Sequence, residues 1–167
     1  MQRSKKILFV SHCILNQNVK AKGTERAPGA IKELLELFSE AEIGLVQLPC
    51  PELEFSGLDR AAKAKEFYDT NGYRSICKKQ AVAVLKQIQN YLKSGYSVLG
   101  ILGIEHSPTC AVYQITNGSK RTPGKGIFIE ELEAEMRKKR FQVPIIGVNL
   151  SNIFTSLEKL QSLLKYS

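Results

Sequence analysis

Four short apolar runs recur along the chain and predict buried strands. They comprise residues 7–10, 43–48, 98–104 and 145–148, and each is rich in Val, Ile and Leu. None of them alternates regularly between apolar and polar positions, which is typical of parallel strands that are covered on both faces.

Helical periodicity fills the segments between these runs. Apolar residues recur at three- and four-residue spacing and predict helices around residues 31–38, 77–92, 129–136 and 154–160. Strands that alternate with helices imply right-handed crossovers. We therefore expect an α/β fold, with an open, mostly parallel, Rossmann-like sheet of about four strands and helices on both faces.

The length of the chain fits one domain, which we expect to span residues 1–167. The chain has 167 residues, 43% of them apolar, and domains average roughly 150 residues. The apolar run at 7–10 is shorter than the roughly 7 to 15 residues of a signal peptide's apolar region. No apolar stretch approaches the ~18 residues of a membrane span. We expect a cytoplasmic protein with no membrane partner.

The formal net charge of +8 favours anionic partners. The densest basic run, residues 137–140, falls at the end of a predicted helix, where cations complement the helix dipole. That explanation is preferred to nucleic-acid contact, so nucleic acid is not expected as a partner. The sequence leaves the oligomeric state open.

Three of the four cysteines follow predicted strands. Cys13, Cys50 and Cys110 come after the first, second and third strands, respectively. In doubly wound sheets ligands bind outside the carboxyl ends of the strands, so these thiols are expected to converge there. Cys77 instead lies on the apolar stripe of a helix and is interpreted as an ordinary core residue.

Three thiolates are one ligand short of the four that close a structural zinc or iron-sulfur site, which leaves a coordination position open for chemistry. Sulfur ligands suit both zinc and iron-sulfur clusters. The spacing alone does not decide between them.

Four motifs, occurring in order between residues 7 and 150, together resemble the 2-thiouracil desulfurases and their relatives. The motifs are Val10-Ser11-His12-Cys13, then Cys50-Pro51-Glu52 with Gly57-Leu58 and Arg60, then Ser107-Pro108-Thr109-Cys110, and last Pro123-Gly124-Lys125-Gly126.

The resemblance implies a 4Fe-4S cluster held by Cys13, Cys50 and Cys110, with one iron free to take the sulfur of a substrate. It implies an enzyme that exchanges the sulfur of a small thiolated pyrimidine, as base or nucleotide, for water oxygen without redox chemistry. Glu52 and Ser107 match the positions expected to transfer protons and orient the substrate. A thiophilic iron would polarise the C=S bond, and a carboxylate beside it would accept a proton from water.

The chain departs from the family's usual pattern beside these motifs. The family usually has a glycine and a basic stretch where this chain has residues 16–20, and Gly-Gly where it has Ser56-Gly57. It usually has a serine and then a glycine around the last ligand, where this chain has Thr109 and Ala111. The departures leave the three cysteines intact and bear on substrate specificity.

Other polar residues near the motifs have two interpretations each. His12 is expected to be structural, since adjacent side chains at a strand end point to opposite faces. His106 is either a substrate-orienting group or a solvated loop histidine, and its neighbour Glu105 is equally ambiguous. The 22-residue segment 105–126 is expected to be a loop that closes over the site. Within it, residues 124–126, including Lys125, are either an anion site or a plain helix entry.

Two other functions compete with the desulfurase hypothesis. One is an iron-sulfur or zinc protein that binds or senses without catalysis. The other is a hydrolase with a cysteine nucleophile, for which His106 would have to pair with Cys110.

Overall fold

The computed structural model describes residues 1–164, and its centre is a four-stranded parallel sheet. The strands are β1 (Lys6–Val10), β2 (Gly44–Gln47), β3 (Ser97–Ile104) and β6 (Ile145–Val148), in the order β2-β1-β3-β6. The four apolar runs therefore form the expected strands, and the predicted fold class is confirmed. The expected domain end at residue 167 lies outside the described residues.

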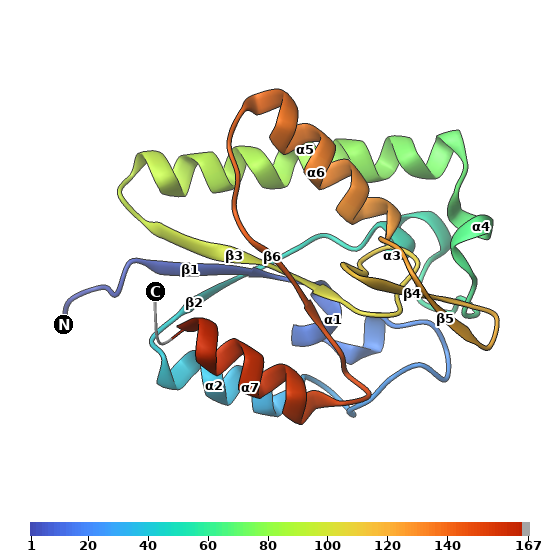
Figure 1. Ribbon diagram of the computed structural model, residues 1–167, viewed down its shortest axis with the longest axis horizontal. Coiled ribbons are helices and arrows are strands. Elements are labelled where there is room, and N and C mark those ends of the chain that lie inside the picture. The colour runs from blue at the N-terminus through green and yellow to red at the C-terminus, as the bar shows by residue number, and fades with distance from the viewer. Residues whose placement is uncertain (165–167) are drawn as a thin grey trace.

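Helices cover both faces of this sheet (Figure 1). The helices α5 (Asn71–Lys93) and α6 (Ile127–Lys139) lie over one face, and α2 (Lys32–Glu40) and α7 (Ile153–Leu164) over the other. Side chains of β1 alternate between two cores, since Phe9 packs with α5 and α6 whereas Leu8 and Val10 pack with α2 and α7. Each fully buried side chain of this size contributes about 1.5–3 kcal/mol, so the two cores hold the layers together.

The strand order creates a crevice at the carboxyl ends of β1 and β3. The chain leaves β1 for β2 through α2 on one face and crosses to β3 through α5 on the other. The connections that follow the two neighbouring strands therefore diverge, which is the arrangement that opens a ligand site in doubly wound sheets.

Several short elements gather at this end of the sheet (Figure 1). They are α1 (His12–Leu15), a 3-10 helix (Gln17–Val19), α3 (Pro51–Ser56), α4 (Lys65–Tyr68), and the strands β4 (Gln114–Asn117) and β5 (Lys120–Pro123). None of them could be predicted from the sequence, because they are too short to show a helical period or a long apolar run.

The segment 105–126 contains a β-hairpin at residues 114–123, which corrects the expectation of a loop without secondary structure. Its strands β4 and β5 pair antiparallel around a turn at Gly118, where φ is +61°. The hairpin is tied to the end of β3, because the His106 N–H donates to the Gln114 carbonyl at 2.8 Å. The Glu105 carboxylate also accepts from the Gln114 N–H at 2.8 Å.

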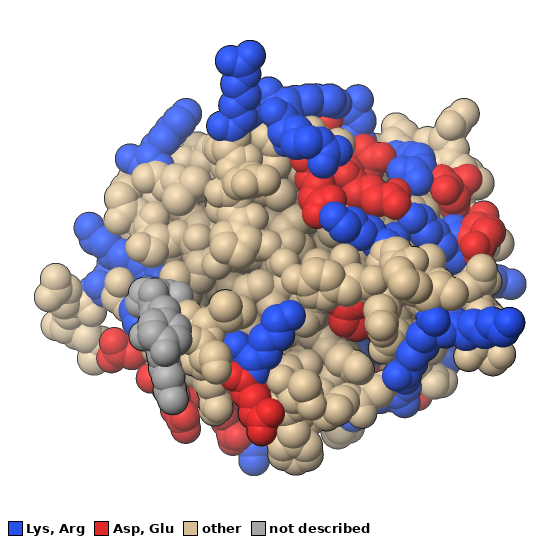
Figure 2. All heavy atoms as spheres, in the orientation of Figure 1, with Lys and Arg blue, Asp and Glu red and all other residues tan. Residues whose placement is uncertain are grey.

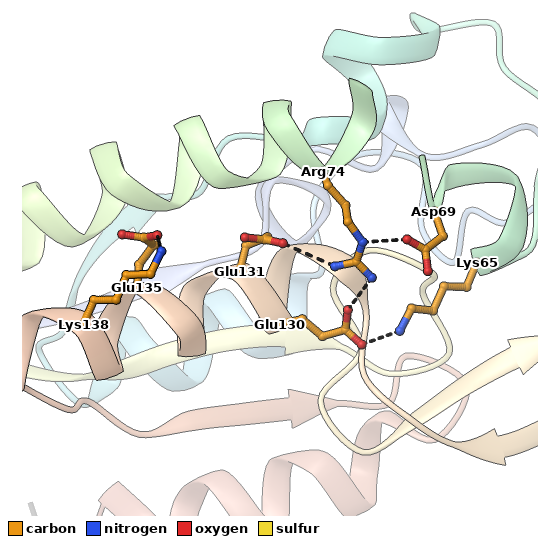
Figure 3. A network of polar contacts seen from close by, with 7 residues as sticks. All are labelled: Lys65, Asp69, Arg74, Glu130, Glu131, Glu135 and Lys138. Carbon is orange, nitrogen blue, oxygen red and sulfur yellow. Dashed lines mark hydrogen bonds and ion pairs between the residues drawn. The ribbon is translucent and has the colours of Figure 1, made fainter. Parts of the chain in front are cut away.

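An ion-pair network links α4, α5 and α6 (Figure 3). Arg74 contacts Asp69, Glu130 and Glu131 at 2.6, 3.0 and 3.3 Å, and Lys65 reaches Glu130 at 2.5 Å. Each exposed pair is worth at most about 1 kcal/mol, but a network of several charges orients the helices more firmly than isolated pairs do.

Charged side chains lie mostly around the edge of the face seen in Figure 2, and the middle of that face carries few of them.

The basic residues at the end of α6 lie in its last turn, where they complement the helix dipole as predicted. No helix within residues 1–164 combines the length and apolar character that a bilayer crossing requires.

Candidate functional site

A cavity of about 460 Å³ lies at the carboxyl ends of the parallel strands. Its lining includes Cys13 after β1, Cys50 and Glu52 after β2, and Ser107 and Cys110 after β3. The structure thus brings these five sequence-predicted residues to one cavity.

Cys77 has a different environment from the other three cysteines. Its side chain is 0% exposed and belongs to the core between the sheet and α5. The interpretation of Cys77 as a core residue is confirmed.

The loop that carries Cys110 is pressed between β3 and α6. The Ile104 N–H donates to the Cys110 carbonyl at 2.9 Å. A Cβ at Gly103 would lie closer to that carbonyl oxygen than the 3.0 Å that real Cβ atoms keep, and a Cβ at Gly126 would crowd the Thr109 carbonyl in the same way. Glycine at these two positions lets the backbone of the Cys110 loop approach both elements.

Ser107 holds the same loop from within. Its Oγ accepts hydrogen bonds from the Thr109 N–H at 3.1 Å and the Cys110 N–H at 3.0 Å. A serine hydroxyl has two acceptor positions and one proton, so the proton of Ser107 remains available to a ligand.

The first N–H groups of α6 also bind this loop. They donate from Gly126 to Ala111 at 2.9 Å, from Ile127 to Pro108 at 3.0 Å, and from Phe128 to Thr109 at 3.0 Å. Lys125 meanwhile forms an ion pair with both oxygens of Glu133, at 2.6 and 2.7 Å. These groups are occupied by the protein, so residues 124–126 are a plain helix entry and not an anion site.

Gln17 and Pro51 stabilise the loops that carry Cys13 and Cys50, respectively. The buried Gln17 side chain donates to the Cys13 carbonyl and accepts from the Arg26 N–H at 2.8 Å. Cys50 is the residue before the first turn of α3, and Pro51 begins that helix with the φ angle a first helical position requires.

Glu52 receives hydrogen bonds from three side chains. Arg60 Nε lies 3.1 Å and the Tyr68 hydroxyl 3.4 Å from Oε2, and the Thr109 hydroxyl lies 2.7 Å from Oε1. The Glu52 side chain is 12% exposed and that of Arg60 is 6% exposed. A carboxylate has about four acceptor sites, so one remains free at the cavity.

Burial dominates the electrostatics of the three cavity thiols. It raises the pKa of Cys13 to about 11 and also raises the pKa of Cys50. Burial raises the pKa of Cys110 as well, with smaller contributions from the neighbouring charges of Cys50 and Cys13. The three sulfurs therefore lie near enough to influence one another, and without a bound cation they stay protonated.

The side chains that could bind a metal ion are those of His, Cys, Asp and Glu. Within residues 1–164, no three or more His, Cys, Asp or Glu side chains are grouped so that they could hold one.

Both histidines line the cavity. His12 is the first residue of α1 and shares that helical turn with Cys13, so the strand-end argument for opposite faces does not apply to it. His106 has a φ of +71°, and in the described part of the chain neither of its buried ring nitrogens has a hydrogen-bond partner.

The contacts of His106 and Cys110 do not support a cysteine-nucleophile hydrolase. His106 does not pair with Cys110, and the raised pKa of the Cys110 thiol is the opposite of what an activated nucleophile requires. The interpretation of His106 as a solvated loop residue is also wrong, because its ring nitrogens are buried.

Glu105 is structural. Its carboxylate accepts from the Tyr113 and Gln114 N–H groups, and it lies so close to Gly147 of β6 that a Cβ there would overlap it. It fastens the hairpin to the sheet.

Comparison with known proteins identifies the family of this chain. The family model "Putative 2-thiouracil desulfurase" matches residues 5–143, a span that contains all three cavity cysteines. The chain belongs to this 2-thiouracil desulfurase family. An uncharacterized protein of Methanocaldococcus jannaschii is 38% identical over 163 residues, which are 95% of this chain and 98% of that protein.

The fold of this desulfurase family member resembles that of a solved protein, the 4Fe-4S-dependent thiouracil desulfidase TudS. The TM-score is 0.53 at 20% sequence identity, and the match covers 95% of this chain and 99% of the other. At 20% sequence identity, this structural similarity supports the fold alone.

The sequence of this family member gave no indication of Tyr68, a partner of Glu52, or of Tyr73, a partner of Thr109. Tyr68 and Tyr73 carry no local signal, since only the packing of α4 and α5 brings them near Glu52 and Thr109. Gly103 did offer a signal, because a glycine inside an apolar strand often marks a close backbone approach.

Basic side chains also line the cavity of this family member. They are Lys20, Arg26, Arg60 and Lys63. Arg60 is neutralised by Glu52, while Lys63 lies 5.2 Å from the centre of the Phe67 ring. The side chains that line the cavity therefore carry a net positive charge, although Glu52 and Glu105 are also among them.

Proposed function

We propose that this protein replaces the thiocarbonyl sulfur of a thiolated pyrimidine by the oxygen of water, with a 4Fe-4S cluster on Cys13, Cys50 and Cys110. The observation that carries this proposal is the meeting of three cysteines at one cavity in a chain of the 2-thiouracil desulfurase family. Thiolates are the usual ligands of such clusters. The fold shared with a 4Fe-4S-dependent thiouracil desulfidase is further support.

The reaction balances without a redox partner. The C=S bond of the substrate is replaced by C=O, one water is consumed, and its two protons leave with the sulfur as hydrogen sulfide. When bound, the cluster supplies a thiophilic Lewis acid at the iron that no cysteine holds, which makes the ring carbon easier to attack.

Two side chains of the chain act on the water and the substrate in this proposal. Glu52 accepts a proton from the attacking water through the acceptor site that its three protein donors leave free. Ser107 orients the substrate by donating a hydrogen bond from its hydroxyl group, since both of its acceptor positions are used by backbone N–H groups.

The substrate we propose is a thiolated base or its nucleotide. Lys20, Arg26 and Lys63 line the cavity, and they favour a ligand that carries negative charge beyond the ring. For this reason thiouridine monophosphate should be assayed together with 2-thiouracil.

Anaerobic reconstitution followed by turnover tests this function. The reconstituted protein is expected to release sulfide and oxygenated product in equal amounts from 2-thiouracil or thiouridine monophosphate, with no added reductant or oxidant. A stable cluster with no turnover of either compound would support the alternative, a protein that binds a cluster without catalysis.

A further inference from the structure

A chain of hydroxyl groups runs from α5 to Glu52. The Tyr73 hydroxyl lies 2.6 Å from Thr109 Oγ1, and Thr109 Oγ1 lies 2.7 Å from Glu52 Oε1. Tyr73 is 0% and Thr109 1% exposed, so water does not compete for these contacts. Hydrogen bonds in such a buried setting are strong, and breaking one leaves a polar group unpaired.

The direction of each hydrogen bond in this chain follows from the number of protons. A threonine hydroxyl has one proton, and Thr109 donates it to the carboxylate of Glu52. The Tyr73 hydroxyl must then donate to Thr109. Burial raises the pKa of Tyr73, so the phenol keeps the proton that this arrangement needs.

Thr109 is also fixed through its backbone. Its N–H donates to Ser107 Oγ at 3.1 Å, and its carbonyl accepts from the Phe128 N–H at 3.0 Å. Every polar atom of Thr109 is therefore engaged, and one residue joins Glu52 and Ser107 to the neighbouring Cys110.

We infer that Thr109 and Tyr73 are positioning residues, which hold the Glu52 carboxylate in the one orientation that serves proton transfer. This inference rests on the proposed function, in which Glu52 is the proton acceptor. Tyr73 sets the rotation of the Thr109 hydroxyl, and Thr109 sets the carboxylate. In this inference both residues act through Glu52 and not on the substrate directly.

Three substitutions test the inference, each measured after anaerobic reconstitution. Thr109→Val keeps the shape of the side chain and removes its hydroxyl, Thr109→Ser keeps the hydroxyl, and Tyr73→Phe removes the phenol oxygen. The matched control is Tyr91→Phe, which removes a phenol oxygen from the same helix, α5, beside Phe9 and Tyr96. Iron content, kcat and KM for 2-thiouracil are measured for each variant.

We expect iron content and KM to stay at the wild-type level in all four variants. The kcat should fall about 10- to 100-fold in Thr109→Val and Tyr73→Phe, the usual cost of removing an outer-shell partner. Thr109→Ser should recover most of the rate, and Tyr91→Phe should keep all of it. A merely structural role would not produce this recovery by serine at constant iron content.

Urea unfolding of the cluster-free protein adds a readout that does not depend on turnover. Thr109→Val and Tyr73→Phe should each lower the urea midpoint of unfolding. The decrease in the double variant should be smaller than the sum of the two single decreases, because the two hydroxyls share one contact. Additive losses, or a wild-type kcat in Thr109→Val, would overturn the inference. A wild-type protein that holds its cluster but turns over no substrate would instead overturn the proposed function.

Discussion

Glu52 combines a fixed orientation with contact to the cavity. Arg60, Tyr68 and Thr109 all donate to it, from α4 and two separate loops. Exposed acids lose much of their orientation to side-chain motion, whereas a carboxylate with three donors is held in place. This is the arrangement expected of a general base that must meet a water molecule at one point.

Glu52→Gln is expected to lower turnover by about 10² to 10⁴, the usual span for a positioned acid-base group. The amide keeps the size of the side chain, so iron content and substrate binding should be unchanged. Glu54→Gln is the matched control, because Glu54 is an exposed residue of α3 that contacts Gln80. A wild-type rate for Glu52→Gln across the pH range would transfer the proton acceptor role to another group that lines the cavity, such as His106.

Cys77→Ala should keep the cluster and lower the free energy of unfolding by about 1 kcal/mol, the centre of the range for single substitutions. The reason is that Cys77 lies on the buried face of α5, in the core and not among the residues that line the cavity. Equilibrium urea unfolding of the cluster-free protein measures the cost. Loss of iron from Cys77→Ala would mean that the fourth cysteine, too, serves the cluster.

Among the elements, α6 has the closest relation to the site. Its first N–H groups bind the carbonyls of the Cys110 loop, and Gly126 lets the two backbones approach. The helix thereby fixes the loop without contributing a side chain to the cavity.

Gly126→Ala is expected to push the Cys110 loop away from α6 and to lower the iron content of the reconstituted protein. Overpacking of this kind typically costs about 1–3 kcal/mol of stability. Gly72→Ala in α5 is the control, since a Cβ there meets nothing within 4 Å. Equal iron contents in the two variants would show that the close approach at Gly126 does not matter to the site.

The long elements could be predicted from the sequence and the short ones could not. Buried parallel strands are continuous apolar runs, so β3 could be predicted from its sequence. The hairpin strands β4 and β5 consist mostly of polar residues in exposed or half-buried positions, and therefore gave no apolar signal. Contacts made by Glu105 and the β3 end hold them in place instead.

At the scale of the whole molecule, topology made the site predictable in part. Parallel strands bring their carboxyl ends to one edge of the sheet, so the positions of Cys13, Cys50 and Cys110 after three strands sufficed to place them at one cavity. The hydroxyl chain from Tyr73 to Glu52 could not be predicted, because it joins residues of α5 and α3 that meet only through packing.

The positive lining of the cavity predicts a salt effect that depends on the substrate. The KM for thiouridine monophosphate should rise with ionic strength, because salt screens exposed charges, while the KM for uncharged 2-thiouracil should change little. Lys63→Gln should raise the nucleotide KM up to about fivefold, the effect of roughly 1 kcal/mol for one exposed ion pair.

The control for this effect is Lys32→Gln on α2, where Lys32 pairs with Glu36 at the surface. It should leave both KM values unchanged. If salt and Lys63→Gln affected the base and the nucleotide equally, the basic residues would have no role in choosing between them.

Iron and acid-labile sulfide counts after anaerobic reconstitution test the central claim most directly. The wild-type chain should hold about four iron and four sulfide ions, as a thiolate-bound 4Fe-4S cluster does, and Cys110→Ser should lose most of them. Zinc without sulfide in the wild-type protein, or a full complement of iron and sulfide in Cys110→Ser, would contradict the claim.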